Sequence, residues 1–152
     1  MQIAEVVETV VTVAANEWKY LADVEVRVAE DLPDLSVYPG EFNQMLLNLL
    51  VNAAHAVKEA VAVGKYEKDS IEITAERDEN AIVLTVKDDA LGIPEEIRPK
   101  VFDSFFTTKD VGLGAGLGLT LAHNAVVRKH GGSLRFETKE GEGSTFFVRL
   151  PL

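Results

Sequence analysis

The sequence predicts an α+β fold, a two-layer sandwich with helices on one face of a mixed, mostly antiparallel sheet. Three observations support this prediction. About three segments carry apolar residues at helical spacing, five or six shorter ones have strand character, and the two kinds are mixed in order along the chain. The 152 residues, 47% hydrophobic and 26% charged, suit a single soluble domain over residues 1–152 with one sizeable core.

Two helices and one strand are expected in the first part of the chain. Residues 3–18 carry apolar side chains at helical spacing, and residues 24–28 alternate valines with charged residues, as a half-buried strand does. Residues 40–60 form the clearest helix, because their apolar side chains make one continuous stripe. The members of this stripe are Phe42, Met45, Leu46, Leu49, Leu50, Ala53 and Val57.

The rest of the chain predicts a hairpin, an irregular segment, a helix and two last strands. Residues 71–75 and 82–86 alternate in hydrophobicity on either side of the sequence "RDEN". Residues 89–115 are mostly irregular, with one short helix near "PEEIRPKVF", and loops of this length in compact domains are usually functional or mobile. A strong helix from 116 to 129 ends at "HGG". The last two strands lie at 134–136 and 146–150, joined by "KEGEG".

The net charge of −10 argues against several classes of partner. A domain this acidic repels nucleic acid and anionic lipid, so we expect no nucleic-acid binding and no membrane contact. No apolar run approaches the ~20 residues of a membrane span, and Glu5 and Glu8 argue against a signal peptide, so a cytoplasmic setting is expected. The chain has no cysteine for disulfides or metal. A polyanion must therefore be bound locally, by backbone amides, a metal ion and a few cations.

Three polar residues, Asn48, Asn52 and His55, lie on one side of the predicted 40–60 helix. At ~100° per residue they lie roughly 120° from the middle of the apolar stripe, so they border the core. Asparagine is a poor helix former, and two of them one turn apart need a reason. The plain alternative is a polar flank that holds asparagines by chance. The functional alternative is that the Asn52 oxygen coordinates Mg²⁺, which prefers oxygen ligands.

Four alternating glycines run directly into the last predicted helix. Glycines let the backbone approach a ligand closely, and the helix N-terminus offers unpaired amides to phosphate. The plain alternative is a flexible loop before a glycine-tolerant helix. The loop lacks the lysine of a Walker motif and lies too late in the chain for a Rossmann unit. The four glycines are Gly112, Gly114, Gly116 and Gly118.

Two further residues have a chemistry that suits a nucleotide. Asp88 ends a predicted strand, where a carboxylate facing a cleft accepts a hydrogen bond from the exocyclic amine of adenine. Lys109 follows Phe105 and Phe106, which pin an irregular segment while the lysine reaches a phosphate as a mobile charge. Taken alone, each has a plain alternative: an aspartate that starts a turn, and a solvated lysine beside a buried phenylalanine.

Together and in this order, these stretches resemble the catalytic and ATP-binding domain of bacterial sensor histidine kinases. That domain belongs to the GHKL superfamily and has the Bergerat ATP-binding fold. "NLLVNA" is similar to its N box, "DDALGIP" to the G1 box, "FDSFFTTK" to the F box and "GLGAGLGL" to the G2 box. "HGGSLRFETKEGEGSTFFVRLP" is similar to the end of the domain, so the resemblance covers essentially the whole chain.

The resemblance implies roles for particular residues. Asn52 matches the asparagine that binds Mg²⁺, and Asn48 the pocket asparagine one turn earlier; these two are the catalytic candidates. Asp88 matches the aspartate that recognises the adenine amino group, and His55 a usually basic position near the phosphates. The other candidates for nucleotide binding are Gly92, Ile93, Lys109, Gly112, Gly114, Gly116, Leu117, Gly118, and Ser144 or Thr145 as a hydroxyl near the base.

The implied function is transfer of the γ-phosphoryl group of ATP, held with Mg²⁺, to a histidine. In the family the acceptor lies on a separate, upstream dimerisation domain, and a response regulator receiver domain is an indirect partner. Nothing in residues 1–40 resembles that helical hairpin, and neither His55, His123 nor His130 has the acceptor's sequence context. We therefore expect an excised domain without an internal acceptor, with Met1 as an expression start.

One position separates this chain from other branches of the superfamily, and two positions depart from the family pattern. Asn48 stands where ATP-hydrolysing members and anti-sigma-factor serine kinases carry a glutamate base, which favours transfer to imidazole over water activation. Asp89 replaces an asparagine, and its negative charge near a triphosphate should repel ATP unless a cation lies close or the side chain points away. Ala90 replaces a glycine, at a cost of roughly 1–2 kcal/mol if its backbone is left-handed. The alternative function is therefore a nucleotide-poor regulatory or interaction domain with a degenerate G1 box.

Overall fold

The computed structural model of the chain describes residues 3–14, 22–30, 32–33, 38–62, 69–89, 122–139 and 143–151. The strands in these residues are β1 (Ala22–Val28), β2 (Asp69–Asp78), β3 (Ala81–Asp88), β4 (Ser133–Lys139) and β5 (Gly143–Pro151). They form one five-stranded sheet in the order β1-β2-β3-β5-β4. β1 pairs with β2 in parallel and the other neighbours are antiparallel, which confirms the mixed, mostly antiparallel sheet.

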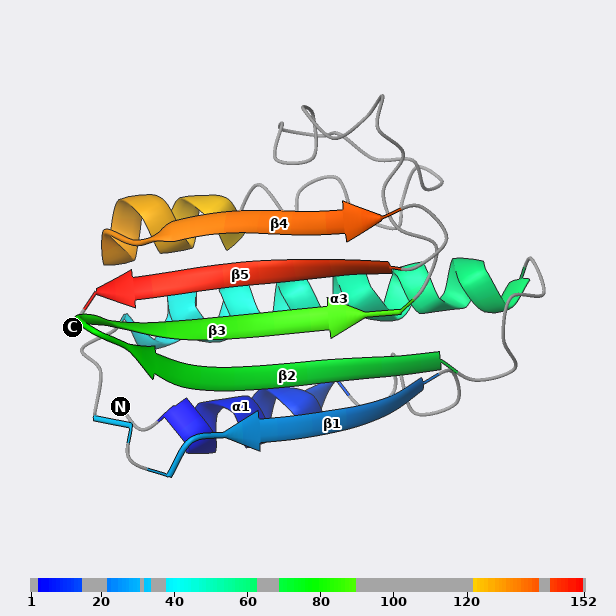
Figure 1. Ribbon diagram of the computed structural model, residues 1–152, viewed down its shortest axis with the longest axis horizontal. Helices are drawn as coiled ribbons and strands as arrows, with labels where there is room; N and C mark the ends of the chain where they lie inside the picture. The colour runs from blue at the N-terminus through cyan, green and yellow to red at the C-terminus, as the bar shows by residue number, and fades with distance from the viewer. Residues whose placement is uncertain are drawn as a thin grey trace.

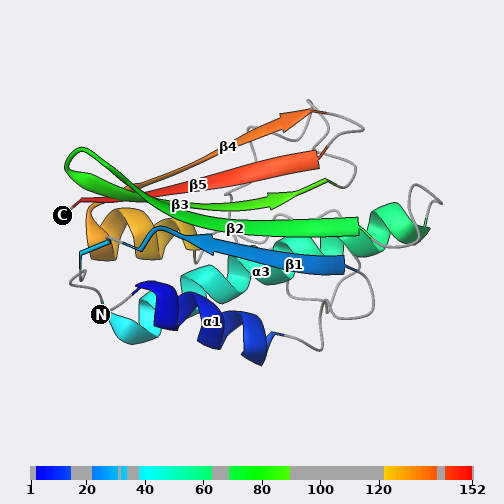
Figure 2. The same ribbon diagram turned by 60° about the horizontal axis from the view of Figure 1, so that its bottom comes forward.

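The described helices lie together on one face of this sheet (Figures 1 and 2). α1 (Ile3–Val13) packs on the long helix α3 (Pro39–Ala62) and on β1. η2 (Ala125–Lys129), a π-helical stretch within helical residues 122–130, packs on α3, β4 and β5. The predicted two-layer sandwich is therefore confirmed. Among the helices of the described ranges, none is long and apolar enough to cross a membrane.

The hydrophobic core fills the space between the helices and the covered face of the sheet, here called the inner face. Alternation places Ile73, Leu84 and Val148 on the inner face, each with 0% of its surface exposed. The apolar stripe predicted for residues 40–60 is buried along its whole length, with Phe42 and Leu49 also at 0%. Full burial of one such side chain stabilises a fold by about 1.5–3 kcal/mol, so the inner face supplies most of the stability.

Local backbone signals set the element boundaries. The turn between β2 and β3 uses Glu79 with φ of 51°, a left-handed conformation typical of tight hairpins. The helix before β4 ends at "HGG" as predicted, because Gly131 adopts φ of 64° and lets the chain reverse. Three predicted features lie outside the described residues: residues 15–18 of the first helix, the short helix over 94–102 and the first part of the 116–129 helix.

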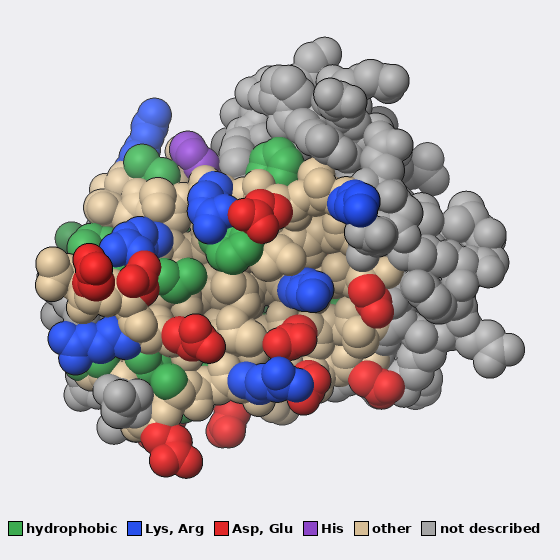
Figure 3. All heavy atoms as spheres, viewed as in Figure 1, with side chains coloured by type: hydrophobic (Ala, Val, Ile, Leu, Met, Phe, Trp, Pro, Cys, Tyr) green, Lys and Arg blue, Asp and Glu red, His purple; other side chains and the backbone are tan. Residues whose placement is uncertain are grey.

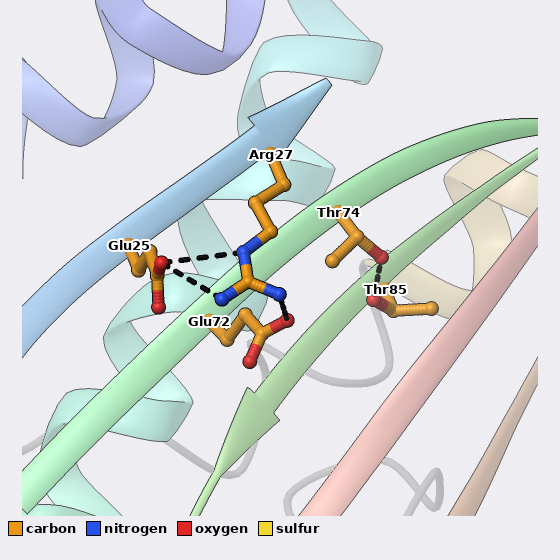
Figure 4. Close-up of polar contacts among 5 residues, drawn as sticks. All are labelled: Glu25, Arg27, Glu72, Thr74 and Thr85. Carbon is orange, nitrogen blue, oxygen red and sulfur yellow. Dashed lines mark hydrogen bonds and ion pairs between the residues drawn. The ribbon is translucent and has the colours of Figure 1, made fainter. Parts of the chain in front are cut away.

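The other face of the sheet, here called the outer face, carries interspersed acidic and basic side chains (Figure 3). Figure 4 shows Arg27 of β1 beside Glu25 and Glu72. Guanidinium nitrogens of Arg27 lie 2.9 Å from Oε1 of Glu25 and 3.7 Å from Oε1 of Glu72. The hydroxyls of Thr74 and Thr85 hydrogen-bond to each other across β2 and β3. No helix of the described residues covers this face, so its polar groups remain close to water.

Candidate functional site

Asp88 and Ser144 are the two polar residues classed as buried in the described part of the chain, with 3% and 7% of their surfaces exposed. They are direct register partners at the end of β3 and the start of β5. Both continue the inner-face alternation, Asp88 after Val86 and Ser144 before Phe146. A buried carboxylate is costly unless polar partners compensate it. A few polar groups at the edge of an apolar layer are typical of a ligand site.

The hydroxyl of Ser144 is oriented by its neighbour on β4. Thr138 Oγ1 donates to the backbone oxygen of Gly143 at 3.1 Å and lies 2.9 Å from Ser144 Oγ. Since the single Thr138 proton serves Gly143, Thr138 accepts from Ser144, which keeps the lone pairs of the Ser144 oxygen available as acceptors. A carboxylate and an acceptor hydroxyl side by side suit a ligand that presents an amine.

Thr145 is the alternative hydroxyl of the sequence prediction, and the register separates it from Ser144. Thr145 pairs with Lys87 on one side and Glu137 on the other, all three on the outer face. Its side chain therefore points away from Asp88, on the far side of the sheet. Of the two candidate hydroxyls, only Ser144 lies on the face that carries Asp88.

The start of β5 fits closely against the end of β3. Gly143 has φ of 115°, and a Cβ built there would lie 2.2 Å from the backbone oxygen of Asp88 and 2.7 Å from Cα of Asp89. No side chain larger than hydrogen fits at these distances, and the positive φ disfavours other residues. The sequence prediction treated "KEGEG" only as a turn and missed this contact, although a glycine at the start of a strand is its signal.

The three polar residues of α3 border the core as predicted. Asn48, Asn52 and His55 are all half-buried. The carboxyl end of β3 lies over the second half of α3, which carries Asn52 and His55, in both ribbon views (Figures 1 and 2). Asn48 Oδ1 accepts from Gln44 at 2.9 Å, while its buried Nδ2 has no hydrogen-bond partner within the described residues. A buried donor of this kind needs a partner from elsewhere, such as a ligand, water or another segment.

Mg²⁺ is compatible with this arrangement through the oxygen of Asn52. Nucleotide-bound Mg²⁺ uses one or two protein oxygens and completes its shell with phosphate oxygens and water. Within the described residues no group of three or more His, Cys, Asp or Glu forms a metal cage. A single amide oxygen beside a triphosphate is therefore the arrangement that would hold the ion here.

The remaining predicted site residues lie outside the described residues. The same holds for Ala90, whose backbone conformation decides whether its Cβ strains the G1 box. The undescribed candidates are Gly92, Ile93, Lys109, Gly112, Gly114, Gly116, Leu117 and Gly118.

Residues 38–152 match the family described as histidine kinase-, DNA gyrase B- and HSP90-like ATPases. The chain is 34% identical to the sensor histidine kinase ZraS of Escherichia coli (strain K12), over 81% of this chain and 24% of ZraS. It is 31% identical to the sensor kinase CckA of Brucella abortus (strain 2308), over 85% of this chain and 14% of CckA. The chain thus spans less than a quarter of the length of these relatives.

The solved catalytic domain of the histidine kinase ThkA is similar in structure, with a TM-score of 0.81 and 28% identity. The similarity covers 99% of this chain and 93% of that domain. Fold and sequence therefore agree, and the chain belongs to the histidine kinase-, DNA gyrase B- and HSP90-like ATPase family as a catalytic domain of the sensor histidine kinase type.

Proposed function

We propose that this domain binds ATP with Mg²⁺ and transfers the γ-phosphoryl group to a histidine on a separate dimerisation domain. The observation that carries this proposal is the buried pair Asp88 and Ser144, two acceptors side by side at one end of an otherwise apolar layer. The 6-amino group of adenine has two N–H donors and suits such a pair. Membership of an ATPase family supports ATP, and not adenine alone, as the ligand.

The other residues are assigned by their match to the family pattern. Asn52 would hold Mg²⁺ through its amide oxygen, the buried Asn48 amide, which has no partner within the described residues, would bond within the same site, and His55 would lie near the phosphates. Residues between Asp88 and the helix that precedes β4 would complete the triphosphate site. Its candidates are Gly92, Ile93, Lys109, Gly112, Gly114, Gly116, Leu117 and Gly118.

The proposed chemistry needs positioning and charge neutralisation more than proton removal. A neutral imidazole nitrogen has a free lone pair, which attacks the γ-phosphorus while the bond to the β-phosphate oxygen breaks and ADP leaves. Attack by water requires a base that takes a proton, and the amide of Asn48 cannot act as one. The chain therefore favours histidine over water as the acceptor.

The partners follow from this assignment. A histidine-bearing dimerisation domain receives the phosphoryl group from ATP, and a receiver domain of a response regulator takes it from the histidine. The net charge of −10 favours protein partners over nucleic acid or anionic lipid. The alternative, a nucleotide-poor regulatory domain, is not favoured, because the relatives compared above are sensor kinases.

Calorimetric titration of the domain with ADP and Mg²⁺ tests nucleotide binding. We expect submillimolar affinity that falls at least about tenfold in Asp88→Asn, because a charge-assisted hydrogen bond to the adenine amine is lost. Asp78→Asn, on the outer face at the other end of the hairpin, is the matched control and should bind like the unmodified domain. No heat at millimolar nucleotide would contradict the proposal.

Phosphoryl transfer needs a second assay. Labelled ATP, Mg²⁺ and the domain are mixed with a histidine-bearing dimerisation hairpin, and the label on the hairpin is tested for stability. Phosphohistidine resists alkali and is hydrolysed by acid, so an alkali-stable, acid-labile label supports the proposal. A label that appears only as free phosphate would instead indicate hydrolysis.

A further inference from the structure

We propose that Asp89 is a positioning residue that fixes Asp88 for reading adenine, and that its own charge is held away from the nucleotide. The inference rests on the proposed function. It concerns the acid that replaces an asparagine in the G1 box, where repulsion of the triphosphate is the simple expectation. The contacts of Asp89 point the other way.

Both carboxylate oxygens of Asp89 are engaged by one residue of β2. The backbone N–H of Ser70 donates to Oδ1 at 2.9 Å, and the hydroxyl of Ser70 donates to Oδ2 at 3.0 Å. The last backbone pair of the two strands is Ile71 with Asp88, so Ser70 and Asp89 occupy the next register position. The side chain of Asp89 thus continues the β2–β3 ladder where backbone pairing stops.

The direction of this bond sets the position of the charge. Ile71 faces the inner side with 0% exposure, so Ser70, its neighbour on the strand, faces the outer side and is exposed. Because the Asp89 carboxylate is bonded to Ser70, it is drawn toward the outer side. α3, with Asn52, packs on the inner side. The Asp89 carboxylate is therefore directed to the opposite side of the sheet from α3, which carries the proposed Mg²⁺ ligand Asn52.

The same bond holds the peptide that follows Asp88. On the β2 side, Asp89 is tied to Ser70; on the β5 side, Gly143 approaches the Asp88 oxygen and the Asp89 Cα too closely for any Cβ. A peptide held by contacts from both neighbouring strands cannot rotate freely, so the Asp88 side chain keeps its inward direction. Loss of the bonds to Ser70 leaves this peptide constrained by Gly143 only.

Geometry, and not charge, is what this role requires. An asparagine at position 89 keeps both bonds, because its oxygen accepts from the Ser70 N–H and its amide donates to the Ser70 hydroxyl. An alanine keeps neither bond. Asp89→Asn and Asp89→Ala therefore separate the two explanations: repulsion by a charge near phosphate, or positioning through Ser70.

The experiment compares ADP with inosine diphosphate, which lacks the 6-amino group, in the presence of Mg²⁺. We expect Asp89→Ala to weaken ADP binding by about tenfold and inosine diphosphate binding much less, so that discrimination between the bases falls. Ser70→Ala, which removes only the hydroxyl bond, should lose about threefold in ADP affinity. Asp89→Asn should stay within about twofold of the unmodified domain.

Asp78→Ala is the matched control, since Asp78 bonds Arg149 on the outer face at the far end of the same hairpin. Asp78→Ala should leave base discrimination unchanged. If Asp89 only stabilised the fold, Asp89→Ala would leave it unchanged as well. If Asp89→Ala and Asp78→Ala discriminate equally between ADP and inosine diphosphate, the inference about Asp89 is overturned, but the proposed function is not. Asp89→Asn that tightens ADP binding tenfold or more also overturns it, because the charge would then face the phosphates. An unmodified domain that binds neither nucleotide overturns the proposed function as well.

If Asp89→Ala does not fold, Ser70→Ala and Asp89→Asn still decide the question. Loss of base discrimination in Ser70→Ala, with Asp89→Asn unaffected, supports positioning. The opposite pattern contradicts it.

Discussion

The two faces of the sheet use polar residues in opposite ways. On the inner face the described strands are apolar almost throughout, and the buried exceptions, Asp88 and Ser144, lie together at one end. On the outer face charged residues are spread over the strands and pair with one another, as Arg27 does with Glu25 and Glu72. A polar residue is therefore ordinary on the outer face, whereas a buried polar residue on the inner face indicates a ligand site.

The difference is physical and follows from water. A charged group on the outer face keeps its hydration, so an ion pair there adds little. A polar group on the inner face gives up hydration and must be compensated by a partner. One step along a strand changes a residue from one condition to the other, and the following predictions test that contrast, beginning with its largest effect.

Leu84→Ala should cause the largest loss of stability. Leu84 has 0% exposure in the middle of β3, and removal of a buried leucine side chain costs about 2–5 kcal/mol of unfolding free energy. Val83, its half-buried neighbour on the outer side, is the matched control. Urea unfolding of Leu84→Ala and Val83→Ala should give at least a twofold larger loss for the leucine; equal losses would contradict the division into faces.

His130→Ala should cost about 1–3 kcal/mol of unfolding free energy, because His130 is a polar residue of the helix layer with both nitrogens bonded inside the chain. Its Nε2 accepts from the N–H of Tyr38 at 2.9 Å, and its Nδ1 lies 2.8 Å from the oxygen of Ala125, to which it must donate. These bonds tie the end of η2 to the start of α3, the opposite end of the layer from Asp88.

Two measurements check the His130 prediction. Thermal or urea unfolding of His130→Ala gives the loss, with Val127→Ala, an exposed position on the same helix, as the control that should change little. The nitrogen chemical shifts of the imidazole should show a proton on Nδ1 and none on Nε2. A proton on Nε2 instead would exclude the bond from Tyr38.

Ser144→Ala should weaken ADP binding by about two- to tenfold, since one neutral hydrogen bond to the base is lost. Thr145→Ala should have no such effect, because the neighbouring hydroxyl lies on the outer face between Lys87 and Glu137. Calorimetric titration of the two variants gives the comparison. An effect of Thr145→Ala as large as that of Ser144→Ala would mean that the base does not lie on the inner face.

The fold was predictable from the sequence because apolar periodicity is a direct record of burial. Local sequence patterns were enough to predict three features: the buried stripe on α3, the alternation in β2 and β3, and the helix end at Gly131. Asp88 could be singled out from the sequence, because a carboxylate directly after an apolar strand is conspicuous, and its role in reading adenine stays a prediction. The end of the helix over 3–18 and the segment that contains Ala90 lie outside the described residues and stay predictions.

Contacts between distant segments were not predictable, since no local pattern encodes them. The bond from Asp89 to Ser70 joins residues 19 apart, and that from Tyr38 to His130 joins residues 92 apart. From sequence, Asp89 was only a charge next to the site, and Ser144 and Thr145 were equivalent. Strand register separates Ser144 from Thr145 by face and places Asp89 beside Ser70, because it fixes which side chains share a face and which residues lie opposite each other.

Arg27→Ala should have the smallest effect on stability of the changes considered. The hydrogen bond and charge of Glu25, with the charge of Glu72, raise the pKa of Arg27 above its usual value. A raised pKa in the folded state means that this stabilisation is present at all pH values below the unfolded pKa and is lost only as pH rises through the folded pKa. Arg27 should therefore contribute no pH dependence near neutrality.

Salt is the variable that reveals the Arg27 contribution. Its guanidinium and the Glu25 carboxylate are more than half exposed, so ions screen the pair effectively. Urea unfolding of Arg27→Ala should show a small loss at low ionic strength that disappears at high salt, whereas the loss in Leu84→Ala should persist. A loss in Arg27→Ala that salt does not reduce would mean that the outer face is covered by a segment that excludes water, and that its charges are not ordinary surface charges.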